Sequence, residues 1–166
     1  MAFPLSFASD IVHRGVEEIR FSPGWADPKA SDYFTYAFVW LLEPPARLDA
    51  PTLKGDLHSY FKGLMASVAW EKQGEAKTEP LGTYVTVDRV RAPRSEPTFP
   101  VRPAYRAEVM TYDAFHAGKK LVLQIDIFEP KSPVEGRQLY YFEASPKPDD
   151  PGVRNNFLKM RRQLQL

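Results

Sequence analysis

The sequence predicts an α+β fold: a curved antiparallel sheet of five to six strands, with one long helix packed on a face and a C-terminal helix. Three observations support this fold class. Proline clusters divide the chain into short apolar segments. One segment has its apolar residues on one helical face, and most of the others alternate with the period of a strand. A helix followed by a run of strands is typical of α+β layers.

Length and composition favour a single domain over residues 1–166. Hydrophobic residues make up 43% of the chain and charged residues 26%, an ordinary globular balance. The net charge of +1 creates no strong field, so we expect neither nucleic acid nor an anionic membrane as a partner. The chain has no cysteine, which excludes disulfides and thiol catalysis. No segment is as long as the ~18 apolar residues that indicate a membrane span.

The N-terminal third is expected to hold two strands. Residues 1–15 show no period and are predicted as an irregular lead-in, and residues 16–21 form a first strand. The segment 33–42 is apolar on both faces, where a half-exposed strand would alternate. It is therefore predicted to be a central strand, packed on one side by the helix that follows.

Residues 50–71 have the clearest helical pattern. Asp49 is a suitable N-cap, and Pro51 lies in the first turn, where its missing N–H is tolerated. Gly55 and Gly63 each cost about 1 kcal/mol relative to alanine, and they would permit the close approach of a neighbour. The apolar face consists of Leu53, Leu57, Phe61, Leu64, Met65 and Val68.

Four further strands and a helix are predicted in the second half of the chain. The strands are 83–91, 104–112, 120–128 and 137–144, joined by short links except for the proline-rich segment after the first. Residues 150–166 form the C-terminal helix.

The C-terminal helix has clear end signals. Asp150 would cap it and Pro151 would open it. Arg161 and Arg162 suit the negative end of the helix dipole.

The two faces of the later strands differ in polarity. Alternation places Leu123 and Ile125 on a core face. The simplest interpretation of the other face is a solvated surface with Arg106–Asp126 cross-strand pairs. The alternative is a concave binding face, where aromatic rings give contact area and a few charged groups fix orientation. Its residues are Arg106, Glu108, Met110, Tyr112, Gln124, Asp126 and Phe128.

The orientation of the aromatic row in 33–42 separates core from pocket. The row consists of Phe34, Tyr36, Phe38 and Trp40. If it faces the side of Leu123 and Ile125 it is core, and function lies elsewhere. If it faces the side of Arg106 and Asp126 it walls a pocket. We favour burial.

The sequence contains no assembled catalytic or metal-binding motif. The histidines His13, His58 and His116 have no neighbour at metal-ligand spacing, and no phosphate-binding loop, dinucleotide fingerprint or nucleophile elbow is present. We therefore assign no catalytic residue, no metal and no cofactor. His58, on the polar face of the long helix, is the first residue to mutate in a test for enzyme activity.

The candidate ligand-binding residues come from the strands and the long helix. They are Tyr36, Trp40, His58, Arg106, Glu108, Gln124, Asp126 and Tyr140.

The element order over residues 33–144 resembles the hotdog arrangement, in which an antiparallel sheet wraps a long helix. The same order also fits cystatin-like and other helix-on-sheet folds. The hotdog resemblance implies an acyl-thioester hydrolase that acts as a dimer. No diagnostic motif accompanies it, and no functional residue is carried over.

Three functions agree with these observations. The leading hypothesis is a non-catalytic domain that binds a small apolar or amphipathic ligand, or another protein, through the sheet–helix face. The second is the hotdog-like hydrolase, and the third is an exported structural or interaction domain. We expect a soluble protein, either cytoplasmic or periplasmic after removal of a leader that this sequence does not contain.

Overall fold

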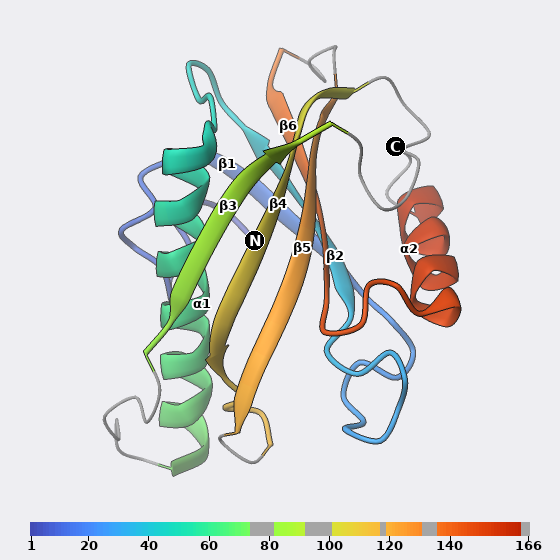
Figure 1. The fold of residues 1–166 in the computed structure, drawn as a ribbon. Coiled ribbons are helices and arrows are strands. Elements are labelled where there is room, and N and C mark those ends of the chain that lie inside the picture. Colours follow the sequence, from blue (N-terminus) through green and yellow to red (C-terminus); the bar gives the residue numbers. More distant parts are fainter. Residues whose placement is uncertain (74–81, 92–100, 117–118, 131–135, 164–166) are drawn as a thin grey trace.

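A computed structural model describes residues 1–73, 82–91, 101–116, 119–130 and 136–163 and confirms the α+β class (Figure 1). The elements are, in order, β1 (Gly15–Phe21), β2 (Tyr36–Leu42), α1 (Ala50–Gln73), β3 (Tyr84–Val90), β4 (Val101–Tyr112), β5 (Lys120–Pro130), β6 (Gln138–Ser145) and α2 (Pro151–Gln163).

The six strands form one antiparallel sheet in the order β1-β2-β6-β5-β4-β3. The chain crosses from β2 to the far edge through α1, and then returns strand by strand until β6 pairs with β2. This topology makes β2 an interior strand, flanked by β1 and β6. That position pairs both edges of β2, and its burial on both faces, predicted from the sequence, comes from the two helices.

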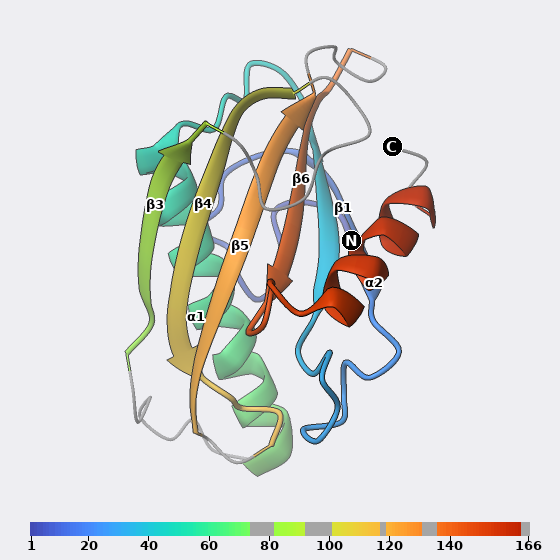
Figure 2. The same ribbon diagram turned by 45° about the vertical axis from the view of Figure 1, so that its right-hand side comes forward.

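The two helices cover opposite faces of the sheet (Figure 2). The larger core lies on the α1 face, where Leu53, Leu57 and Phe61 meet the apolar side chains of the strands. A smaller core lies under α2, where Val153 and Phe157 pack with the outward residues of β2, β5 and β6. The second face of β2 is therefore covered by α2, which the sequence reasoning did not foresee.

The predicted helix caps are present. Asp49 Oδ1 accepts the Thr52 N–H at 2.9 Å, and α1 begins at the next residue after Asp49. Asp150 Oδ1 accepts the Gly152 N–H at 2.8 Å at the start of α2. The last three residues of the predicted C-terminal helix, 164–166, lie outside the described residues, as do most of the connections at 72–82 and 92–103.

The strand β2 begins at Tyr36, three residues later than predicted. Phe34 has a φ of 53°, in the left-handed region that no strand uses. The residues before β2 therefore belong to a turn that closes the loop after β1, and their aromatic side chains are free of the strand's alternation.

The N-terminal lead-in is irregular, as predicted, but it is also packed. Phe3, Leu5 and Ile11 are buried in the larger core. The lead-in approaches α1 so closely at Gly63 that a Cβ there would lie 1.7 Å from the carbonyl oxygen of Phe7. The proposed role of the helix glycines thus holds for Gly63 and not for Gly55, which has nothing within 4 Å.

The last turn of α2 contains Arg161 and Arg162, as predicted. Arg161 is also 1% exposed, and its Nε donates to Glu143 Oε1 at 2.7 Å, a pairing that the sequence did not indicate. The reason is that α2 turns this residue toward the sheet face carrying Glu143. Tyr112, predicted on the polar face, packs in the α1-side core, because β4 ends at this residue and strict alternation ends with it.

None of the helices in the described part of the chain combines the length and apolar character needed to cross a bilayer.

Candidate ligand-binding cavity

The aromatic row of β2 faces α1, on the same side as Leu123 and Ile125. Phe38 stacks on Phe142 of β6 with ring centroids 4.3 Å apart, and on Tyr60 of α1 at 5.5 Å. By the criterion set from the sequence, this row is core. Its first members are an exception, because Phe34 and Tyr36 also line a cavity.

The cavity has a volume of about 400 Å³ and lies between α1, the lead-in and the β1–β2 side of the sheet. This volume is within the range of small-molecule pockets. Ser6, Ser67 and Glu71 supply polar groups, and most of the lining is apolar. Its aromatic residues are Phe7, Phe21, Trp25, Phe34, Tyr36, Tyr60 and Phe115.

The aromatic wall is built from segments far apart in the sequence. Trp25, in the loop between β1 and β2, contacts Phe21 with ring centroids 4.5 Å apart and Phe115 at 5.3 Å. Phe115 belongs to the β4–β5 hairpin and contacts Phe34 at 5.5 Å. The wall therefore forms only when the sheet brings this hairpin beside the β1–β2 loop.

Two residues of the cavity lining each have a polar atom that is buried, with almost no accessible surface, and without a hydrogen-bond partner in the described structure. These atoms are Trp25 Nε1 and the Tyr36 hydroxyl. A third such atom, Glu17 Oε2, lies close to Tyr36 and Tyr60. Buried polar groups in native proteins are nearly always paired, so these three atoms are exceptions that gather beside the cavity.

Glu17 is a buried carboxyl on the apolar face of β1. It sits opposite Trp40 in the register, and its Oε1 accepts the Trp40 indole N–H at 3.0 Å. Burial raises the pKa of Glu17, and hydrogen bonds from Trp40 and Tyr60 oppose that rise. Burial, together with the charge of Glu17, holds the pKa values of Tyr36 and Tyr60 well above the usual range.

A second polar cluster fastens the β4–β5 hairpin to the loop before β2. The Tyr33 hydroxyl donates to Asp113 Oδ2 and lies 2.9 Å from His116 Nδ1. Asp113 Oδ1 accepts the backbone N–H groups of Phe115 and His116. Burial and Asp113 raise the pKa of Tyr33, which opposes formation of a phenolate nucleophile. The cluster can hold a proton and fix the loop, and it positions Phe115 at the cavity.

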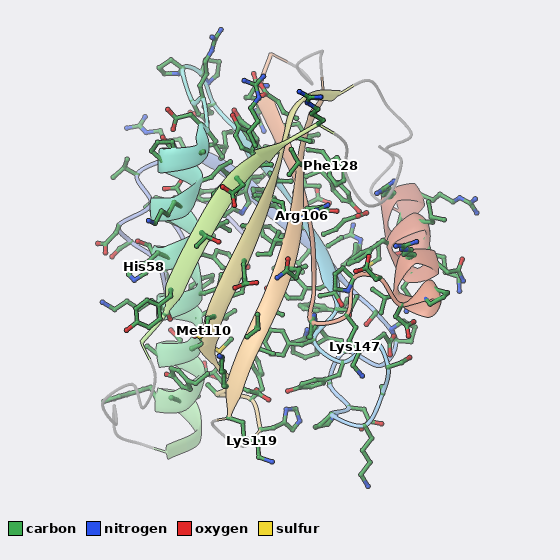
Figure 3. All side chains as sticks on the ribbon, viewed as in Figure 1. His58, Arg106, Met110, Lys119, Phe128 and Lys147 are labelled. Atoms are coloured by element: carbon green, nitrogen blue, oxygen red, sulfur yellow. The ribbon has the colours of Figure 1, made fainter. Side chains whose placement is uncertain are left out.

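The four polar candidates from the sequence lie on the opposite face of the sheet. Arg106 Nε donates to Asp126 Oδ1 at 2.8 Å, the cross-strand pair that the alternation predicted. Gln124 Nε2 donates to Glu108 Oε2 at 2.5 Å. Figure 3 shows Arg106 on this face, separated by the sheet from α1. None of the four lines the cavity on the α1 side.

The other four candidates lie on the α1 side in different places. Tyr36 lines the cavity. Trp40 is fully buried and does not line it; its indole N–H donates a hydrogen bond to Glu17. Tyr140 is remote: its hydroxyl accepts the Leu48 N–H at 2.9 Å, and burial raises its pKa to about 12. His58 is half-buried on α1 and projects away from the sheet in Figure 3.

Sequence reasoning missed Glu17, Trp25 and Tyr60. A signal existed for Glu17, because it alternates with Ile19 and Phe21 and so stands on the apolar face of its strand. A carboxyl in that position is rarely buried unless it is paired. Trp25 had no such signal, since its position depends on how the β1–β2 loop folds back.

In the described residues, no group of three histidine, aspartate or glutamate side chains is placed to hold a metal ion. Comparisons of the chain with models of protein families, with curated proteins and with solved structures gave no significant match.

Proposed function

We propose that this protein binds a small amphipathic ligand in the cavity between α1 and the β1–β2 side of the sheet. The observation that carries the proposal is an aromatic-lined cavity, two of whose lining residues, Trp25 and Tyr36, each have a buried polar atom without a partner just beneath the wall. Leaving such an atom unpaired costs about 1–3 kcal/mol. A ligand that hydrogen-bonds to them would therefore recover part of this cost on binding.

The two atoms restrict the polar part of the ligand. An indole N–H can only donate, so Trp25 requires an acceptor oxygen or nitrogen. A tyrosine hydroxyl can donate or accept, so Tyr36 accommodates either kind of group. The aromatic walls favour an apolar body, because most of the affinity in such sites comes from buried apolar contact.

Binding can be tested with phenoxypropanol, an uncharged probe that has an aromatic ring and two oxygen acceptors. Titration calorimetry on the full chain should give saturable binding to one site. Ser67→Phe places a large ring in the cavity and should abolish binding. Ala66→Phe adds the same ring at the adjacent exposed position, outside the cavity lining, and should leave binding intact.

The calorimetric result distinguishes a ligand-binding site from a gap in the packing that binds no ligand. Equal binding by wild type and Ser67→Phe, or no binding of the probe to wild type, would overturn the proposal. A catalytic role has a separate test on a panel of acyl-coenzyme A thioesters. Hydrolysis that disappears in His58→Ala would replace the binding proposal with the hydrolase that the hotdog resemblance implied.

A further inference from the structure

We infer that the cavity takes an organic ammonium compound with an apolar body and a neutral oxygen, rather than a fatty-acid-like anion. This inference rests on the proposed binding function and specifies its ligand class. It is carried by the charges around the cavity, by its aromatic faces and by the unpartnered Tyr36 hydroxyl.

The charged groups near the cavity are mainly acidic. Glu71 lines it with an exposed carboxyl, and the buried Glu17 lies beside Tyr36 and Tyr60. The cationic group is the Met1 ammonium, which already donates to the Glu17 backbone carbonyl. No lysine, arginine or histidine side chain is among the described residues of the lining. A carboxylate ligand would thus meet the Glu71 carboxyl in the lining and the Glu17 carboxyl behind it, and the Met1 ammonium would be the one opposing charge among the described lining residues.

The aromatic wall also favours a cation. The faces of Phe21, Trp25 and Phe34 carry the negative part of the ring quadrupole, and their centroids lie 4.5–6.1 Å from their neighbours along the wall. Clusters of this kind attract ammonium groups and do not attract carboxylates.

The unpartnered polar atoms agree with this assignment. Tyr36 is only 3% exposed, and its hydroxyl oxygen can accept a hydrogen bond from an ammonium group. Trp25 Nε1 needs an acceptor, which a hydroxyl or ether oxygen provides without adding negative charge. An ammonium compound that carries such an oxygen matches the hydrogen-bonding capacity of both atoms, which a shift of the two lining side chains would bring to the cavity surface.

Three probes with one shared phenoxypropyl body test the inference: phenoxypropylamine, phenoxypropanol and phenoxypropionate. Calorimetry near neutral pH should rank their affinities in the order amine, alcohol, carboxylate. The amine should bind at least about tenfold more tightly than the carboxylate, which corresponds to about 1.4 kcal/mol. An amine that binds no more tightly than the alcohol, or a carboxylate that equals the amine, would overturn the inference.

Charge variants locate the source of the preference. Glu71→Gln removes the exposed lining carboxyl at little risk to folding, and it should narrow the ratio of amine to carboxylate affinity several-fold. Glu17→Gln should also narrow the ratio of amine to carboxylate affinity. The control is Glu18→Gln, which removes the neighbouring exposed carboxyl on the other side of β1 and should leave the ratio unchanged. An unchanged ratio in both Glu71→Gln and Glu17→Gln would contradict the electrostatic argument.

The two proposals fail in distinguishable ways. If phenoxypropanol binds and Ser67→Phe abolishes its binding, the binding function holds whatever the ranking by charge. If no probe binds, both proposals fall.

Discussion

The packing of the N-terminal lead-in on α1 depends on one glycine, and a pair of alanine substitutions can test it. Gly55 and Gly63 both lie inside α1, so alanine should favour the helix at either position by about 1 kcal/mol. Their surroundings differ: a Cβ at Gly55 meets open space, whereas a Cβ at Gly63 would lie 1.7 Å from the Phe7 carbonyl oxygen.

The structure sets the expected size of the effect. Real Cβ atoms keep about 3.0 Å from such neighbours, so Gly63→Ala requires the backbone at Phe7 to move by about 1.3 Å. Overpacking of this kind typically costs about 1–3 kcal/mol. Because both variants share the helix-propensity gain, they should differ in unfolding free energy by the overpacking cost alone, about 2 kcal/mol. For a chain of this length that difference corresponds to about 4–8 °C in Tm.

The assay is urea and thermal unfolding followed by circular dichroism. Gly55→Ala should unfold at a higher urea concentration than wild type, and Gly63→Ala at a lower one. Phe7 also walls the cavity and packs edge-on against Tyr60, so Gly63→Ala should in addition weaken phenoxypropanol binding. If Gly63→Ala stabilises the protein as much as Gly55→Ala does, the lead-in does not pack on α1 as described.

The remaining predictions concern buried ionisable groups. Arg161→Met should lower the unfolding free energy by about 3–5 kcal/mol because it leaves Glu143 charged and buried, and adding Glu143→Leu should recover part of the loss in a double-mutant cycle. The folded-state pKa of Glu17 is raised, so its contribution is present at low pH and is lost as pH rises through that pKa. Glu17→Gln should therefore raise the urea midpoint at neutral pH, and this gain should vanish below about pH 4; a constant gain at all pH values would show that titration is not involved. Tyr33 also has a raised pKa, so its contribution is complete below about pH 10 and is lost at higher pH. Tyr33→Phe should destabilise the protein by about 1–3 kcal/mol at neutral pH, because it removes the hydrogen bond to Asp113, and it should show a smaller loss of stability above that pH than wild type does.

Local patterns were sufficient to predict the elements. The helical spacing of Leu53, Leu57 and Phe61, with Asp49 as the cap, placed α1 to within a few residues. Alternation also identified the Arg106–Asp126 pair, because cross-strand neighbours in a hairpin are close in sequence and their register follows from the short turn. These features depend on interactions between residues near one another in the chain.

The cavity depended on contacts that the sequence leaves open. The row starting at Phe34 and Tyr36 was correctly interpreted as apolar on both sides, but whether its end was core or cavity wall depended on Trp25 and Phe115, which reach it from two loops. Phe34 and Tyr36 line the cavity because the chain makes a left-handed turn at Phe34 and because the Tyr33–Asp113 hydrogen bond holds the β4–β5 hairpin beside that turn.

The sequence by itself thus determined the α+β class, the helix and strand positions, their caps and the polarity of each strand face. Only the tertiary structure decided which residues surround the cavity, that Glu17 is buried beside it, and that Arg161 is a buried ion-pair partner of Glu143. The physical reason is the distance along the chain over which each effect acts. Propensity, capping and alternation act within a few residues, whereas burial and pairing of a side chain depend on which distant segment packs against it.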